Sequence, residues 1–273
     1  MADGRLLWRV LDNLMSWRRA ASGYGRGSCR MRDWVCGFFM AWGMFLAIPC
    51  PRKIWSEGAR QKMLVCMPLV GLLAGGVWAG AWLLLRGAPG PVRAAVCAAV
   101  PWLVTGFMHL DGYMDVCDAV LSRRDLATRQ RILKDSHCGA FAVICMVLLA
   151  MGQWSLFLAA EDVSWLALLL IPAATRACAG LAVLGLRPMG TSQYAAMGPA
   201  RGGYGAALWV LLALSVGLPL WLDGSFGPLA AAVGYGLAVW YGFRNLDGMS
   251  GDISGFALTI GELCGCGAAI LWR

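Results

Sequence analysis

The sequence predicts an all-α, polytopic membrane protein with about seven transmembrane helices and one further segment that is re-entrant or interfacial. Of its 273 residues, 59% are hydrophobic and 14% are charged, and the mean hydropathy is +0.64. Soluble domains carry about 25% charged residues. Long apolar runs alternate with short polar loops, which is typical of helices that cross a bilayer. The lipid bilayer is therefore an expected partner.

The net charge of +8 does not by itself predict a nucleic-acid partner. In a membrane protein, an excess of Lys and Arg ordinarily marks cytoplasmic loops and attracts anionic lipid. We expect no nucleic-acid partner, and the pattern leaves a monomer and a homo-oligomer both open.

Residues 1–33 are expected to form a basic amphipathic extension before a single integral-membrane domain at 34–273. Apolar residues recur at helical spacing within 6–14 and are flanked by Arg and Trp, which favours a helix lying in the headgroup layer. Residues 22–28 are rich in Gly and Ser and favour a flexible link.

The membrane domain begins with an apolar segment, 34–48, that is short for a span and is closed by Pro49. In the first full span, the spacing of Gly71, Gly75, Gly76 and Gly80 favours close contact with another helix. Pro101 interrupts the second span. The expected spans are 63–85, 92–110, 139–160, 165–186, 205–222, 226–243 and 253–272.

Loop charge predicts the orientation, because Lys and Arg are enriched on the cytoplasmic side. The turns at 161–164 and 223–225 contain no Lys or Arg, whereas the 111–138 loop is basic. That loop therefore faces the cytoplasm. Counting back through two spans also places the 49–62 loop in the cytoplasm, and the basic N-terminus is expected on the same side. Both can hold only if residues 34–48 do not cross the membrane. The basic residues of the 111–138 loop are Arg123, Arg124, Arg129, Arg131 and Lys134.

Three aspartates, Asp111, Asp115 and Asp118, follow a strongly apolar segment. If they lie on one helix, Asp115 is about 40° and Asp118 about 20° from Asp111 around the axis. Like charges on one face repel one another unless a cation lies between them, and Mg²⁺ prefers oxygen ligands of this kind. A solvated acidic helix end is the simpler alternative.

A second polar group, from Asn245 to Gly255, opens the last span. On a helix, Asp252, Thr259 and Glu262 fall within about 80° of one another. An acid inside a span costs roughly 2.5–3.5 kcal/mol, so Glu262 is expected to face a polar interior. Arg176 lies inside another span and is expected to pair with a carboxylate or a phosphate. The alternatives are a buried structural hydrogen bond for Glu262 and a helix N-cap for Asp252.

The stretch between the two acidic groups is polar and basic. Asp125 is an expected helix N-cap, followed by Leu126, Arg129 and Leu133 at helical spacing. Carboxylates beside a cluster of Arg and Lys suit a metal-bound diphosphate. The alternative is that these arginines bind no substrate and only mark the cytoplasmic side of the membrane. His109 is off the carboxylate face of a continuous helix, and a satisfied interface histidine is the commoner case.

These motifs resemble the cobalamin synthase family, the adenosylcobinamide-GDP ribazoletransferases, from about residue 34 to the end. His137 stands where that family's pattern has arginine, and the 190–204 loop lacks an expected lysine. The matching stretches are His109-Leu110-Asp111-Gly112 with Asp115 and Asp118, Lys134-Asp135-Ser136 with Gly139, Ile48-Pro49-Cys50-Pro51 with Trp55, Pro68 to Gly71, Gly248-Met249-Ser250-Gly251-Asp252, and Gly261-Glu262-Leu263.

The resemblance implies transfer of the corrinoid phosphoryl unit from adenosylcobinamide-GDP to α-ribazole or its 5′-phosphate, with release of GMP and a requirement for Mg²⁺. It also implies a wide cleft for the corrinoid. The expected location is a bacterial cytoplasmic (inner) membrane, and the loop charges place the active site on its cytoplasmic side. The expected Mg²⁺ ligands are Asp111, Asp115 and Asp118, and Asp135 and Asp252 complete the site or act as base. The expected substrate-binding residues are His109, Arg123, Arg124, Arg131, Lys134, Ser136, Arg176, Asn245 and Glu262.

Two other classes of function remain open. A CDP-alcohol phosphotransferase would carry D-x-x-D-G-x-x-A-R followed by G-x-x-x-D-x-x-x-D, and that pattern is absent. An ion-coupled transporter would spread its acids over several spans or show an internal repeat, and no clear repeat is present.

Overall fold

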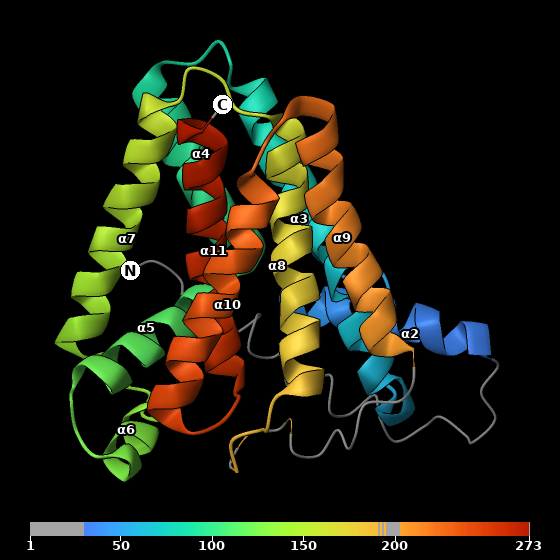
Figure 1. The fold of residues 1–273 in the computed structure, drawn as a ribbon, viewed down its shortest axis with the longest axis vertical. Helices are drawn as coiled ribbons and strands as arrows, with labels where there is room; N and C mark the ends of the chain where they lie inside the picture. The colour runs from blue at the N-terminus through green and yellow to red at the C-terminus, as the bar shows by residue number, and fades with distance from the viewer. Residues whose placement is uncertain (1–29, 191, 193, 195–202, 273) are drawn as a thin grey trace, which may run out of the picture.

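The structure is a computed structural model that describes residues 30–190, 192, 194 and 203–272. The helix expected within 6–14 and the link expected at 22–28 lie outside these residues. The described chain is built from helices (Figure 1). They are α2 (Arg30–Phe45), the 3-10 helix η2 (Glu57–Ala59), α3 (Arg60–Leu84), α4 (Gly90–Val104), α5 (Met108–Leu121), α6 (Leu126–Ile132), α7 (Ala140–Ala159), α8 (Trp165–Gly185), α9 (Tyr204–Asp223), α10 (Gly227–Leu246) and α11 (Gly251–Leu271).

The predicted all-α membrane architecture is confirmed. Among the described residues, 5 helices are long and apolar enough to cross a membrane, and the bent pair α4–α5 raises the number to 6 if it counts as one span. The five are α3, α7, α8, α9 and α11. Helix α10 has 20 residues and packs along α11, but its glycines and tyrosines keep it below the hydropathy of the others.

Helix α2 has 16 residues and is not among the membrane-spanning candidates. In Figure 1 it runs across the lower end of α3 instead of alongside it. The two helices are joined by an ion pair between Lys62 Nζ and Asp33 Oδ2, 2.5 Å apart. This placement agrees with the expectation that residues 34–48 do not cross.

Glycines bring α3 and α8 into backbone contact at the centre of the bundle. A Cβ on Gly71 would lie 2.6 Å from the Pro172 carbonyl oxygen, and one on Gly75 would lie 2.0 Å from that of Leu169. No side chain other than hydrogen fits at either position. The expected close contact is therefore correct for Gly71 and Gly75, whereas Gly80 faces open space.

The second expected span, 92–110, is wrong as a single helix. Helix α4 ends at Val104 and α5 begins at Met108, with a bend of 90° between them. Pro101 does not cause the break: the Cys97 carbonyl, which a proline at position 101 cannot bond, accepts a 2.7 Å hydrogen bond from Trp78 Nε1. The chain turns at Gly106 and Phe107, which have φ of 60° and 63°.

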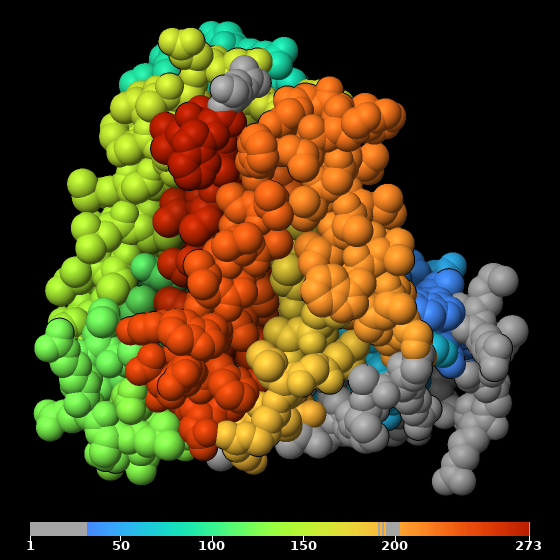
Figure 2. Space-filling model, viewed as in Figure 1, coloured from blue at the N-terminus to red at the C-terminus, as the bar shows by residue number. Residues whose placement is uncertain are grey.

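The bend sends α5 across the bundle, so that its aspartates lie at one end of the molecule. In Figure 1 this end holds α5, α6 and the turn between α10 and α11, and the C-terminus lies at the opposite end. Helix α10 covers much of α11 on the face drawn in Figure 2. The two acidic groups of the sequence thus meet where α5 packs against α11.

Candidate active site

A cavity of about 200 Å³ lies between α2, α3, α5 and α11. Asp111 and His109 reach it from α5, and Asp252 reaches it from the first turn of α11. Tyr194, Trp55 and Arg60 also line it. The cavity therefore joins the two acidic groups, which are far apart in the sequence.

The three aspartates lie on one helix, as their spacing predicts, because α5 continues from Met108 to Leu121. The carboxylate of Asp115 is within electrostatic range of those of Asp111, Asp118 and Asp252. Four carboxylates are thus gathered between α5 and α11. Such a cluster favours a bound cation, because the like charges otherwise repel one another.

Asp118 has a structural role that the sequence did not reveal. Its Oδ2 accepts a 2.6 Å hydrogen bond from the Gly139 backbone N–H, and its Oδ1 accepts a 2.9 Å bond from that of Ala142. It therefore caps the N-terminus of α7 from a neighbouring helix. A Cβ on Gly139 would lie 2.6 Å from Asp118 Oδ1, so glycine is needed there. Both carboxylate oxygens are occupied, which sets Asp118 apart from the other two aspartates.

Asp252 is not the N-cap of α11. The cap is Ser250, whose side chain accepts a 3.3 Å hydrogen bond from the Ile253 backbone N–H. Asp252 is the second residue of α11 and is half-buried, facing the cavity, and its Oδ2 accepts a 3.4 Å hydrogen bond from Ser250 Oγ. The capping alternative for Asp252 is therefore wrong, and its carboxylate is available to a ligand.

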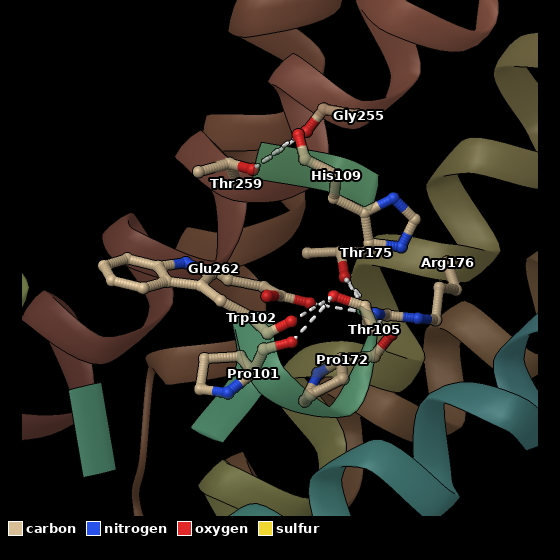
Figure 3. Close-up of polar contacts among 10 residues, drawn as sticks. All are labelled: Pro101, Trp102, Thr105, His109, Pro172, Thr175, Arg176, Gly255, Thr259 and Glu262. Carbon is tan, nitrogen blue, oxygen red and sulfur yellow. Dashed lines mark hydrogen bonds and ion pairs between the residues drawn. The ribbon is translucent and has the colours of Figure 1, made fainter. Parts of the chain in front are cut away.

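His109 is buried at the edge of the cavity. Its ring stacks on Phe45, with centroids 6.2 Å apart, and its backbone carbonyl accepts a 3.3 Å hydrogen bond from Thr259 Oγ1 (Figure 3). Its Nε2 is buried and has no hydrogen-bond partner in the described part of the chain. A buried polar atom without a partner is costly, so this nitrogen suits a polar group of a ligand.

Arg176 and Glu262 form a buried ion pair, 2.5 Å between Nη1 and Oε1, deep between α8 and α11 (Figure 3). Their side chains are 1% and 7% exposed. Arg176 Nη1 also donates to the Pro172 carbonyl oxygen and to Thr175 Oγ1. Neither residue lines the cavity. The pairing predicted for Arg176 is confirmed with a carboxylate as partner, and the pair lies away from the cavity that Asp111 and Asp252 line.

The basic residues of the 111–138 loop lie outside the cavity. Asp125 caps α6, as expected, and the hydrogen bond from the Thr128 backbone N–H lowers the pKa of its carboxyl. Asn245 accepts a 3.0 Å hydrogen bond from Arg129 and thereby ties α10 to α6. The expected substrate-binding residues that are exposed on this loop are Arg123, Arg124, Arg131, Lys134 and Ser136.

Asp135 lies on the same loop and is not at the cavity. Its carboxylate is 2.6 Å from His137 Nδ1, and this hydrogen bond holds the pKa of Asp135 below its ordinary value. The expected role of Asp135 as a base or a completing ligand is therefore not supported by its position.

Arg60, Trp55 and Tyr194 line the cavity but were not among the expected site residues. The Arg60 guanidinium lies 6.0 Å from the centroid of the Trp55 ring and 3.1 Å from Glu57 Oε2. The sequence signal for Trp55 was its place beside the family-like stretch Ile48-Pro49-Cys50-Pro51. It gave no indication that Trp55 lines the same cavity as Asp252 of α11.

Among the described residues, no group of three His, Cys, Asp or Glu side chains is placed to hold a metal ion by itself. The expected trio of Asp111, Asp115 and Asp118 is therefore not assembled as a complete site. Mg²⁺ keeps several waters and is usually bound by one or two carboxylates together with substrate phosphates. Asp111 and Asp252, on one cavity beside Asp115, fit this requirement.

The model of one protein family, described as cobalamin-5-phosphate synthase, matches residues 37–270 of the chain. Three relatives are named adenosylcobinamide-GDP ribazoletransferase. That of Clostridium botulinum (strain Alaska E43 / Type E3) is 32% identical over 257 residues, 89% of this chain and 100% of the relative. That of Clostridium perfringens (strain 13 / Type A) is 33% identical over 237 residues, 83% and 94% of the two chains.

The third, of Geobacillus thermodenitrificans (strain NG80-2), is 30% identical over 249 residues, 85% of this chain and 94% of the relative. No solved structure matches the chain significantly. The matched region contains every residue that lines the cavity.

Proposed function

The chain belongs to the cobalamin-5-phosphate synthase family, and on this basis we propose that it is an adenosylcobinamide-GDP ribazoletransferase. The acceptor is α-ribazole or its 5′-phosphate, and the products are cobalamin or cobalamin 5′-phosphate together with GMP. The observation that carries the proposal is the shared cavity of Asp111 and Asp252, two carboxylates from the two acidic groups of the sequence.

The reaction is a phosphoryl transfer in which a ribose hydroxyl oxygen of the acceptor attacks the phosphorus next to the cobinamide. The bond from that phosphorus to the GMP oxygen breaks, and the hydroxyl proton passes to a base. Such transfers need positioning and charge neutralisation more than covalent help from the protein. Mg²⁺, when bound, would neutralise the diphosphate and the developing charge on GMP.

We assign Mg²⁺ binding to Asp111 and Asp252, with Asp115 beside them. Asp118 is assigned a structural role, because both of its carboxylate oxygens accept hydrogen bonds from the N-terminus of α7. Its two hydrogen bonds keep the start of α7 and the end of the basic loop against α5. We also assign to Asp252 the uptake of the proton from the attacking hydroxyl, because its carboxylate lines the cavity and Ser250, not Asp252, caps α11.

We propose that the basic residues of the 111–138 loop bind the part of adenosylcobinamide-GDP that lies outside the cavity. A corrinoid is far larger than about 200 Å³, so the cavity at Asp111 is not the wide cleft expected for it. The exposed Arg123, Arg124, Arg131 and Lys134 lie at the same end of the molecule, where guanidinium and ammonium groups can bind phosphate oxygens.

The chain is a multi-pass membrane protein by the length and composition of its helices. We propose that it lies in the bacterial cytoplasmic membrane with the cavity facing the cytoplasm. The basic loop supports this orientation, since Lys and Arg are enriched on that side. Soluble nucleotide substrates would then reach the site directly.

The proposed activity is tested with detergent-purified protein, adenosylcobinamide-GDP, Mg²⁺ and either α-ribazole or its 5′-phosphate. One GMP is expected per corrinoid product, and none without the acceptor or with excess EDTA. GMP release that does not depend on the acceptor would indicate a hydrolase and contradict the proposal.

A further inference from the structure

The cavity has a second wall whose chemistry differs from that of the carboxylates. Asp111 and Asp252 are contributed by α5 and α11, whereas the other wall is formed by thioether and aromatic side chains from α2, α3, the segment before η2 and the first residue of α5. The residues of this methionine wall are Met44, Phe45, Trp55, Met63, Met67 and Met108.

Four methionines line this one small cavity. Methionine is flexible and polarisable, and its sulfur makes favourable contacts with aromatic rings. Phe45 and Trp55 add flat apolar surface. A wall of this composition suits a planar, apolar ring. Arg60 also lines the cavity, and its guanidinium lies 6.0 Å from the centroid of the Trp55 ring.

The volume of the cavity further limits which ligands can bind in it. An apolar cavity of about 150 Å³ holds a benzene molecule. The cavity of about 200 Å³ therefore accepts a ring system of similar thickness and excludes a corrinoid.

His109 lies where the two walls meet. One face of its ring stacks on Phe45 of the methionine wall, and its buried Nε2 has no hydrogen-bond partner among the described residues. The ligand therefore needs a polar group next to its apolar ring. A sugar hydroxyl at this position would satisfy the nitrogen and lie beside the carboxylates.

We propose that this cavity is the acceptor subsite, with the benzimidazole ring of α-ribazole against the methionine wall and its ribose between His109 and Asp252. This inference rests on the proposed function and names which of the two substrates occupies the cavity. The dimethylbenzimidazole ring carries methyl groups where guanine carries polar groups. Any part of a guanine edge that lies against the methionines themselves would lose its hydrogen bonds to water without replacement, which costs binding energy.

Substitutions in the methionine wall test the assignment. Met67→Ala removes a side chain that is 4% exposed, and Met108→Ala removes one that is 36% exposed and less important for folding. Met151→Ala is the matched control, because Met151 is 60% exposed on α7 and away from the cavity. Binding of α-ribazole to each purified protein is measured by equilibrium dialysis, and KM is measured for both substrates.

Each wall variant is expected to weaken α-ribazole binding and to raise its KM by about tenfold, the scale of a lost buried apolar contact. The KM for adenosylcobinamide-GDP should remain within twofold of wild type (about 0.4 kcal/mol). A variant that raises the KM for adenosylcobinamide-GDP and leaves that for α-ribazole unchanged would overturn the subsite while the proposed function stands.

If the proposed function is wrong, the experiment gives a result that differs from the one that overturns the subsite. Wild-type protein would then release no acceptor-dependent GMP at any concentration of α-ribazole. Tight α-ribazole binding that the wall variants weaken would still support the subsite in that case. Binding that is equal in wild type, Met108→Ala and Met151→Ala would overturn it.

Discussion

The backbone of Asp252 lies directly against Gly112. A Cβ on Gly112 would be 2.9 Å from the Asp252 carbonyl oxygen and 3.0 Å from its Cα. This contact sets the first turn of α11 against α5, one residue beyond Asp111. Glycine at position 112 is therefore what allows Asp111 and Asp252 to line the same cavity.

Gly112→Ala is expected to separate the two helices and to lower kcat/KM by at least about tenfold, because positioning errors near 1 Å cost up to about 100-fold. The control is Gly152→Ala on α7, where a Cβ meets nothing within 4 Å. That variant should keep full activity and gain slightly in helix stability. Equal activity of the two variants would show that the contact at Gly112 does not position the aspartates.

Two variants, Asp252→Ser and Ser250→Ala, distinguish a role in the reaction from a role in capping α11. Because Ser250 is the cap, its loss is expected to lower the free energy of unfolding by about 1 kcal/mol with a smaller effect on kcat. Asp252→Ser should leave thermal unfolding close to that of wild type and lower kcat by about 10² or more. An Asp252→Ser variant with wild-type kcat would remove this carboxylate from the reaction.

The Arg176–Glu262 pair is expected to support the fold and not substrate binding. Removing one partner leaves a buried charge without a counter-charge, so Glu262→Leu should lower the free energy of unfolding by about 3–5 kcal/mol. The double variant Arg176→Met with Glu262→Leu should recover much of this loss. Thermal unfolding in detergent measures both. A fully stable Glu262→Leu variant with a raised substrate KM would instead favour the substrate role expected from the sequence.

The orientation predicts which cysteines a membrane-impermeant maleimide can reach in intact cells. Native Cys138 is exposed at the end with the basic loop, and Glu161 is exposed in the turn between α7 and α8 at the opposite end. Wild type should remain unlabelled from outside, and Glu161→Cys should be labelled. Labelling of Cys138 without permeabilising the cells would reverse the topology.

Most helices could be predicted from the sequence because their apolar runs end at clear polar turns. The spans expected at 139–160 and 165–186 correspond to α7 and α8 within a residue or so. The bend between α4 and α5 could not be predicted in the same way. Proline at position 101 was the visible signal, but a contact from distant Trp78 stabilises the helix there, and the break falls at Gly106 and Phe107.

The candidate site was predictable as a set of acidic residues but not as an arrangement. Spacing placed the three aspartates on one helix, yet the hydrogen bonds of Asp118 come from the start of another helix. Whether Ser250 or Asp252 caps α11 depends on backbone geometry that the sequence pattern does not contain. The partner of Arg176 lies 86 residues away along the chain, and only the packing of α8 on α11 identifies it as Glu262.

The cation site is tested most directly by the binding of Mn²⁺, a paramagnetic substitute for Mg²⁺, followed by electron paramagnetic resonance on purified protein with adenosylcobinamide-GDP. Asp111→Asn and Asp252→Asn should each weaken Mn²⁺ binding by at least about tenfold, because each removes a ligand charge. Asp118→Asn should leave Mn²⁺ binding close to wild type and lower thermal stability through the N-terminus of α7. Unchanged Mn²⁺ binding by Asp252→Asn, together with its loss in Asp118→Asn, would contradict the assignment of the cation to Asp111 and Asp252.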